Sequence, residues 1–188
     1  MRKVIFQMLT TLDGYFEGPN QEIDWHNVDS EFEDHALELI SQVDLMLFGR
    51  VTYEMMADFW PSEHARKVDP MMADAMNRCE KIVFSKTLKK ATWENSRLVT
   101  GDAADEVRRL KQMPGKDMVI FGSSDLAASL LGKGLIDEIQ IIVNPILLGA
   151  GKTLLTGVQQ RVPLKLLAVH TFKNGNVLLT YQPTEKEM

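Results

Sequence analysis

The chain has 188 residues, with 26 acidic and 21 basic side chains and a formal net charge of −5. The length predicts one domain, 1–188, and the 45% hydrophobic and 25% charged content argues against disorder. The acidic balance argues against a nucleic-acid partner, and the apolar runs are too short to cross a membrane. A single cysteine, Cys79, excludes an internal disulfide. The N-terminus lacks a signal-peptide pattern, so we expect a cytoplasmic protein, and we infer that it acts on a small molecule.

Alternating strands and helices are predicted along the first two-thirds of the chain. The first strand, Val4–Thr10, ends at the turn dipeptide Asp13-Gly14, and residues 15–27 are expected to form a long loop. Ser30 and Glu33 form a capping box at the start of a helix. The later elements are strand Val43–Phe48, a helix from Gly49 to Pro61, helix Pro70–Arg78, strands Lys81–Phe84 and Ser96–Thr100, a helix from Asp102 to Gln112, strand Asp117–Phe121, and a helix from Gly122 to Gly132.

The last third of the chain is strand-like. Ile136–Val143, Leu164–Phe172 and Val177–Tyr181 have strand patterns, and Asn174-Gly175 is a hairpin signal between the last two. Strands that alternate with helices and then end in a hairpin predict an α/β fold. We expect a mostly parallel central sheet with flanking helices and a C-terminal antiparallel hairpin.

Three junctions where a strand leads into a turn or helix carry glycine or hydroxyl residues. They are Gly49-Arg50-Val51-Thr52, Ser85-Lys86-Thr87 and Gly122-Ser123-Ser124-Asp125. Free amide groups at helix starts favour phosphate, and Arg50 and Lys86 would add charge-assisted contacts. Any one junction is more often only a turn, but three of them with two cations favour a nucleotide site beyond the carboxyl ends of the strands.

The order and spacing of several short motifs resemble the dihydrofolate-reductase-like superfamily. The resemblance is to the reductase half of the bifunctional riboflavin-biosynthesis deaminase-reductase and to its stand-alone relatives. The matching segments run nearly end to end: Thr11-Leu12-Asp13-Gly14, Phe48–Glu54, Ile82–Leu88, Ile120–Leu126, Gly134–Glu138 and Asn144–Gly151.

The resemblance implies NADPH as the cofactor. Its Gly-Arg-x-Thr motif, which binds the cofactor phosphates, corresponds to Gly49, Arg50 and Thr52, while Ser85 and Lys86 would lie near the adenosine 2′-phosphate. A Gly-Gly junction that contacts pyrophosphate and nicotinamide corresponds here to Gly122-Ser123, so serine replaces the second glycine. The matching segments add four further expected cofactor contacts: Leu12, Ser124, Asp125 and Leu126.

Acidic residues near the first helix are the candidates for substrate chemistry. Folate reductases carry a single pocket carboxylate there, and Asp29 and Glu31 are retained as catalytic candidates, although an acid at a helix start is also favoured by the helix dipole. Glu33 is set aside because it fits the capping box. Asp13 either faces the nicotinamide pocket or makes the turn with Gly14.

No site is predicted from the histidines or from the methionines. The four histidines have no metal-binding spacing, so no metal is expected. The eleven methionines stand mostly at helical core spacing and are interpreted as core residues rather than as a binding surface.

The sequence thus favours an NADPH-dependent reductase of a small heterocyclic, carbonyl or imine substrate. The alternatives are 5-amino-6-(5-phosphoribosylamino)uracil reductase and a nucleotide-binding module without turnover. The acidic residues of the 15–27 loop argue against a phosphorylated substrate because like charges repel. The strand surface of 139–143 and of the terminal hairpin predicts a homodimer, which the resemblance also implies.

Overall fold

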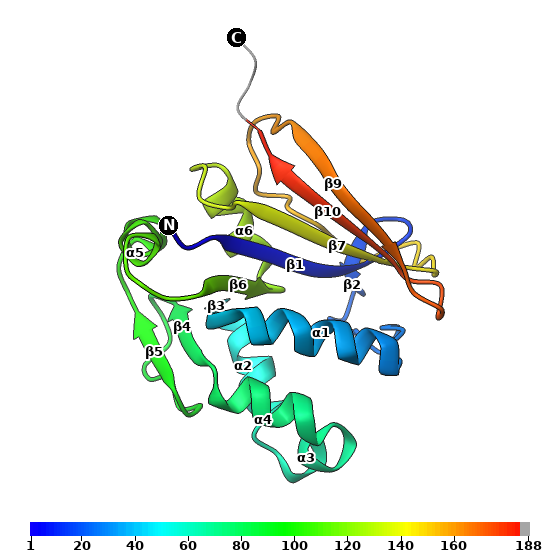
Figure 1. Ribbon diagram of the computed structural model, residues 1–188, viewed down its shortest axis with the longest axis horizontal. Helices are drawn as coiled ribbons and strands as arrows, with labels where there is room; N and C mark the ends of the chain where they lie inside the picture. The colour runs from blue at the N-terminus through cyan, green and yellow to red at the C-terminus, as the bar shows by residue number, and fades with distance from the viewer. Residues whose placement is uncertain (185–188) are drawn as a thin grey trace.

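The computed structural model describes residues 1–184 as a sheet covered by helices on both faces (Figure 1). Its strand order is β5-β4-β3-β6-β1-β7-β10-β9. The strands are β1 (Val4–Thr11), β3 (Val43–Gly49), β4 (Glu80–Phe84), β5 (Ser96–Val99), β6 (Asp117–Phe121), β7 (Glu138–Asn144), β9 (Leu164–Thr171) and β10 (Val177–Pro183). The helices are α1 (Ser30–Gln42), α2 (Arg50–Phe59), α3 (Glu63–Val68), α4 (Pro70–Arg78), α5 (Ala103–Lys111) and α6 (Ser124–Leu131).

The sheet is parallel from β5 to β7, and only β10 and β9 run antiparallel to their neighbours. The predicted α/β architecture with a C-terminal antiparallel hairpin is therefore confirmed. The predicted bounds of α4 and β6 agree with the structure, and Gly175 turns the β9–β10 hairpin with a φ of 92°. That positive φ explains why Asn-Gly is a reliable signal at this place.

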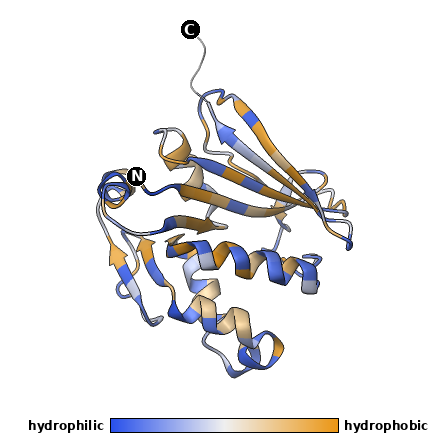
Figure 2. Cartoon of the chain, viewed as in Figure 1, coloured by the Kyte–Doolittle hydropathy of each residue, from blue (hydrophilic) through white to orange (hydrophobic). Residues whose placement is uncertain are grey.

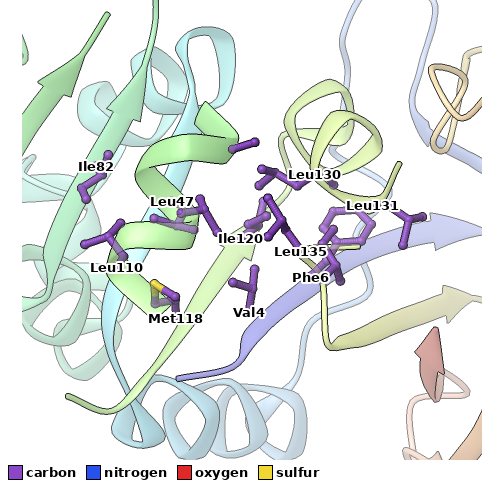
Figure 3. Close-up of a cluster of buried hydrophobic side chains, with 14 of the residues drawn as sticks. Val4, Phe6, Leu47, Ile82, Leu110, Met118, Ile120, Leu130, Leu131 and Leu135 are labelled. Carbon is purple, nitrogen blue, oxygen red and sulfur yellow. The ribbon is translucent and has the colours of Figure 1, made fainter. Parts of the chain in front are cut away.

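Alternating strand side chains divide the core into two layers. Val4, Phe6, Met118 and Ile120 face α5 and α6 on one side of the sheet (Figure 3), together with other apolar residues. The intervening side chains, such as Val119, face α1, α2 and α4 on the other side. Figure 2 shows that the central strands are hydrophobic along most of their length, as expected for parallel strands buried on both faces.

Two expectations about local structure are wrong, and one helix was not expected. The 15–27 segment is not wholly a loop, because β2 (Tyr15–Glu17) pairs with β8 (Lys152–Thr153) in a small second sheet. Helix α3 was not predicted, since six residues are too few to show a helical period. Residues 139–143 offer no free strand surface, because β7 lies between β1 and β10.

Candidate functional site

The three predicted junctions meet at one edge of the sheet. They follow β4, β3 and β6, which are consecutive parallel strands and therefore end on the same side (Figure 1). The register pairs Gly49 with Phe84, so Gly49-Arg50 and Ser85-Lys86 are neighbours. This edge is where open α/β sheets bind their ligands.

Hydrogen bonds join the β3 and β6 junctions directly. The Gly49 amide donates to the Ser123 hydroxyl over 3.0 Å, and the Ser123 amide donates to the Thr52 hydroxyl over 3.1 Å. Gly122 and Ser123 both have positive φ angles, 64° and 55°. A Cβ atom at Gly122 would lie 3.2 Å from Thr52 Cγ2, so both the positive φ angle and the limited space favour glycine there. Ser123, by contrast, holds a left-handed conformation that is uncommon for a residue with a side chain.

Helices α2 and α6 both begin at this edge without a side-chain cap. Gly49, the N-cap of α2, has no side chain, and the N-cap hydroxyl of α6, from Ser123, is occupied with the Gly49 amide. Two neighbouring helix starts therefore present first-turn amide groups and the positive ends of their dipoles. Arg50, in the first turn of α2, is 44% exposed and forms an ion pair with Glu54 at 2.7 Å.

The β4 junction is a turn rather than a helix start. The Ser85 hydroxyl accepts hydrogen bonds from the amides of Thr87 and Leu88, at 3.1 and 2.9 Å. Lys86 is exposed on this turn, beside the β3 junction. The serine thus shapes the turn, and the lysine remains accessible to an anion.

The other four expected cofactor contacts lie in different surroundings. Leu12 is 68% exposed and its amide donates to the Ile146 carbonyl. Ser124 is buried, and its hydroxyl accepts from the Leu155 amide over 2.8 Å. Leu126 is partly buried against the core, and Asp125 is exposed in the first turn of α6. The side chains of Ser124 and Leu126 therefore hold α6 in place.

A cavity of about 470 Å³ opens next to the β6 junction. It lies between β1, α1, α2 and α4, and Thr52, Gly122 and Ser123 form part of its wall. Its volume is typical of a small-molecule site. Most of the wall is apolar, and the residues that line it include Glu17, Glu33 and Asp69 but no lysine or arginine. Glu17 is paired with Lys152 at 2.9 Å.

A larger hollow of about 1210 Å³ lies at the opposite edge of the sheet. Asp44, Glu80 and Ser96, at or near the amino ends of β3, β4 and β5, line it. Ligands of open α/β sheets bind beyond the carboxyl ends of the strands, so the smaller cavity is the candidate substrate site.

None of the three predicted catalytic acids lines this cavity. The Asp13 carboxylate accepts hydrogen bonds from the Thr11 hydroxyl and from the amides of Gly149 and Leu148, and these bonds, Thr11 foremost, lower the pKa of Asp13. It therefore ties the end of β1 to the 145–151 loop. Asp29 caps α1 by accepting from the Phe32 amide.

Glu31 accepts from the Lys173 amide over 3.0 Å, so its carboxylate holds the β9–β10 turn against α1. The predicted capping box is also wrong. Asp29 is the N-cap and Ser30 is the first helical residue, so Glu33 is not needed as a capping partner. The structure instead brings Glu33 to the cavity wall.

Glu33 is thus the carboxyl group that sequence reasoning missed. Burial raises the pKa of Glu33, and repulsion from Asp69, Asp34 and Asp29 raises it further. A carboxyl group in such surroundings keeps its proton to higher pH than an isolated glutamate. The signal that could have found it is the aspartate before Ser30, which can cap the helix alone.

The interpretation of the methionines as core residues is confirmed for Met8, Met46, Met72, Met76 and Met118, which are buried in the core, but some methionines also line the cavity. Met55, which is 43% exposed, lines the cavity rather than the core. Four more methionines contribute to the same wall: Met8, Met56, Met72 and Met76. They share the wall with aromatic residues such as Phe59 and Trp60. The wall of the cavity is therefore rich in methionine.

Residues 1–184 contain neither a cluster of metal-ligating side chains nor a membrane-spanning helix. No group of three or more His, Cys, Asp or Glu side chains in this range is arranged to hold a metal ion. Within the same residues, no helix is both long enough and apolar enough to span a membrane.

Comparisons with known proteins identify the family. Residues 2–178 match the RibD C-terminal domain. Uncharacterized protein YyaP of Bacillus subtilis (strain 168) is 31% identical over 181 residues, which cover 96% of this chain and 94% of that protein.

Solved structures agree on the fold. The "Putative riboflavin biosynthesis protein" of Shewanella sp. PV-4 superposes with a TM-score of 0.73 at 24% identity, covering 97% of this chain and 99% of that one. Dihydrofolate reductase from Enterococcus faecalis, complexed with NADP(H), gives 0.63 at 12% identity and covers 97% of each chain. The chain therefore belongs to the RibD C-terminal domain family and has a dihydrofolate-reductase-like fold.

Proposed function

We propose that this protein is an NADPH-dependent reductase that acts on a small, unphosphorylated carbonyl, imine or heterocyclic substrate. One observation carries the proposal. Thr52, Gly122 and Ser123 belong both to the edge with the two uncapped helix starts and to the wall of the 470 Å³ cavity. A cofactor bound along that edge would therefore reach a substrate held in the cavity.

The residues at the edge fit a dinucleotide phosphate. The amide groups at the starts of α2 and α6 would hold the pyrophosphate, and Arg50, in the first turn of α2, would add a charge-assisted contact to the cofactor phosphates. Lys86 is the accessible cation for a 2′-phosphate. The enterococcal reductase of the same fold is complexed with NADP(H), which supports this choice.

When bound, NADPH supplies a hydride, and the protein's part is to bind, orient and protonate. The apolar cavity wall would exclude water and hold the substrate beside the β6 junction. Glu33 is the proposed proton source, since burial and the neighbouring acids favour its protonated form. Asp13, Asp29 and Glu31 would support the site through their backbone contacts rather than touch the substrate.

The charge of the cavity wall argues against a phosphorylated substrate. Among the described residues that line it there is no lysine or arginine, and Lys152, the cation beside it, is already paired with Glu17. A phosphate close to Glu33 and Asp69 would meet like charges. A neutral or cationic substrate fits this wall better than a phosphoribosyl compound.

We also propose that the protein forms a homodimer through the outer face of the C-terminal hairpin. The pairing of β9 with β10 puts Leu164, Leu166 and Val169 on one face, where they are 45%, 50% and 54% exposed. β9 is also an edge strand with a free row of backbone groups. A second copy would cover this apolar surface.

Steady-state NADPH oxidation tests the catalytic proposal. The phosphorylated ribosylaminopyrimidine is compared with a panel of neutral and cationic pyrimidines, pterins and dicarbonyl compounds. We expect turnover with members of the panel and little with the phosphorylated compound. A kcat/KM above roughly 10⁴ M⁻¹s⁻¹ for the phosphorylated pyrimidine would assign the protein to riboflavin synthesis instead. NADPH binding without consumption of any compound would indicate a non-catalytic binding module.

A further inference from the structure

Ser123 has a backbone conformation that a residue with a side chain seldom adopts. Its φ and ψ angles are 55° and 52°, in the left-handed region, where the Cβ atom crowds the backbone. Glycine, which the resemblance places at this position, would adopt the same angles without that cost. Strained residues that persist at a candidate site point to a role for the side chain. What serine has and glycine lacks is the hydroxyl group.

The hydroxyl group joins the β6 junction to the β3 junction. Ser123 Oγ accepts a hydrogen bond over 3.0 Å from the amide of Gly49, which lies 74 residues earlier in the chain. The Ser123 amide donates in turn to the Thr52 hydroxyl over 3.1 Å. Ser123 is only 9% exposed, so water competes little for these two bonds. One serine thus forms a two-bond clamp between the two junctions.

The left-handed conformation decides which helix the hydroxyl serves. The N-cap residues of α1, α2, α3 and α5 are extended, which is the usual conformation of an N-cap. In α1, α3 and α5 the side chain of the N-cap accepts from an amide of its own helix. Ser123 is the N-cap of α6, yet its hydroxyl accepts from Gly49, the N-cap of α2. The serine therefore leaves the first turn of α6 uncapped and ties it to the start of α2.

We propose that Ser123 is a positioning residue, which holds the uncapped starts of α2 and α6 side by side so that they bind one pyrophosphate group jointly. The proposal rests on the proposed function in taking this edge as the cofactor site. Two helix starts that are held together in advance bind a shared ligand more tightly, because the ligand does not have to order them. Ser123 acts through Gly49 and Thr52 and need not touch the cofactor.

A pair of ligands separates joint binding from binding in general. NADPH has a pyrophosphate group that would contact both helix starts. Adenosine 2′,5′-bisphosphate keeps the adenosine and its 2′-phosphate, but it has a single phosphate in place of the pyrophosphate and no nicotinamide half. Only the first ligand can depend on the spacing of the two starts. Calorimetric titration gives the dissociation constant of each ligand without turnover.

Three variants complete the experiment. Ser123→Ala removes the hydroxyl and keeps the strained conformation, whereas Ser123→Gly removes both. Ser62→Ala is the matched control, since the Ser62 hydroxyl caps α3 by accepting from the Ala65 amide over 3.1 Å. We expect both Ser123 variants to weaken NADPH by about two- to tenfold and the bisphosphate by less than about twofold. Ser62→Ala should change neither constant.

Urea unfolding of the same variants separates the hydroxyl group from the strain. Ser123→Gly relieves the left-handed conformation, so its unfolding midpoint should be at or above that of Ser123→Ala. The two variants should nevertheless weaken NADPH alike, because both lack the hydroxyl. A role in stability alone would instead make NADPH binding follow the order of the unfolding midpoints.

Several results would overturn the proposal. Equal weakening of both ligands by Ser123→Ala would indicate a general loosening of the edge, and unchanged NADPH binding would show that the clamp has no part in recognition. Weaker NADPH binding by Ser123→Ala but not by Ser123→Gly would assign the effect to strain. If the unaltered protein binds no NADPH, the proposed function fails together with this proposal. Binding of NADPH that is insensitive to Ser123 refutes only the positioning role.

Discussion

The ion pair between Arg50 and Glu54 sets the size of the effect expected when Arg50 is replaced. A hydrogen bond from arginine to a phosphate contributes about 1.5–3 kcal/mol. To reach a phosphate, Arg50 must give up its exposed contact with Glu54 at 2.7 Å, and such a pair contributes about 0.3–0.5 kcal/mol. Arg50→Ala should therefore weaken NADPH binding by about 1–2.7 kcal/mol, or roughly five- to hundredfold.

The same ion pair predicts that a substitution of Glu54 tightens NADPH binding. Glu54→Gln frees Arg50 and should tighten NADPH binding by about twofold. A matched control exists on α4, where Arg78 and Asp74 form another exposed pair four residues apart, at 3.1 Å. Arg78→Ala makes the same charge change far from the β3 junction and should leave binding unaltered.

Titration of NADPH fluorescence measures all three variants, and NADH is titrated in parallel. We expect Arg50→Ala to weaken NADPH more than NADH. Equal losses would assign Arg50 to the pyrophosphate that both cofactors share. If Arg50→Ala and Arg78→Ala bind NADPH equally well, the reasoning that phosphate binds at the start of α2 is refuted.

Three other predictions concern stability, pH and assembly. Tyr53→Phe removes the buried acceptor of the Trp93 amide, now at 2.9 Å, and should lower the free energy of unfolding by about 1–3 kcal/mol in urea titrations; no change would mean that the bond contributes nothing. Because the pKa of Glu33 is raised, kcat/KM should fall as the pH rises through that pKa. The Glu33→Gln variant should have a lower kcat/KM that does not fall over the same pH range. A variant with the same pH profile as the unaltered protein would exclude Glu33 as the acid. Lysine at both Leu166 and Val169 should convert a dimer to a 21.3 kDa monomer in light scattering, and a monomer without these substitutions would contradict the proposed interface.

The sequence was sufficient to predict the longer helices and strands, whose start and end signals lie within the element itself. Asp102 caps α5 as predicted, and Pro70 starts α4 because its ring fits the first helical position. The gathering of the three junctions followed from the parallel strands alone. What could be predicted of the candidate site is therefore the edge of the sheet where the three junctions meet.

The residues that line the cavity could not be predicted, for two physical reasons. Asp29 and Ser30 can each cap a helix, and one residue of difference in the start decides whether Glu33 serves the cap or is free to line the cavity. Periodicity shows that the methionines of α2 and α4 face inward, but a core and a cavity wall have the same pattern. Only the packing of distant segments distinguishes them.

The position of β1 also determines when the protein can fold during synthesis. β1 is made first, yet it lies between β6 and β7, whose residues begin at Asp117 and Glu138. At typical translation rates of about 5–20 residues per second, the ribosome needs roughly 6–25 s to reach β7 after β1. Phe6, fully buried in the finished sheet, has no partner strand until β6 is made, and one side of β1 stays unpaired until β7 follows. The nascent chain thus exposes an apolar strand before its sheet can close, and during that interval aggregation competes with folding.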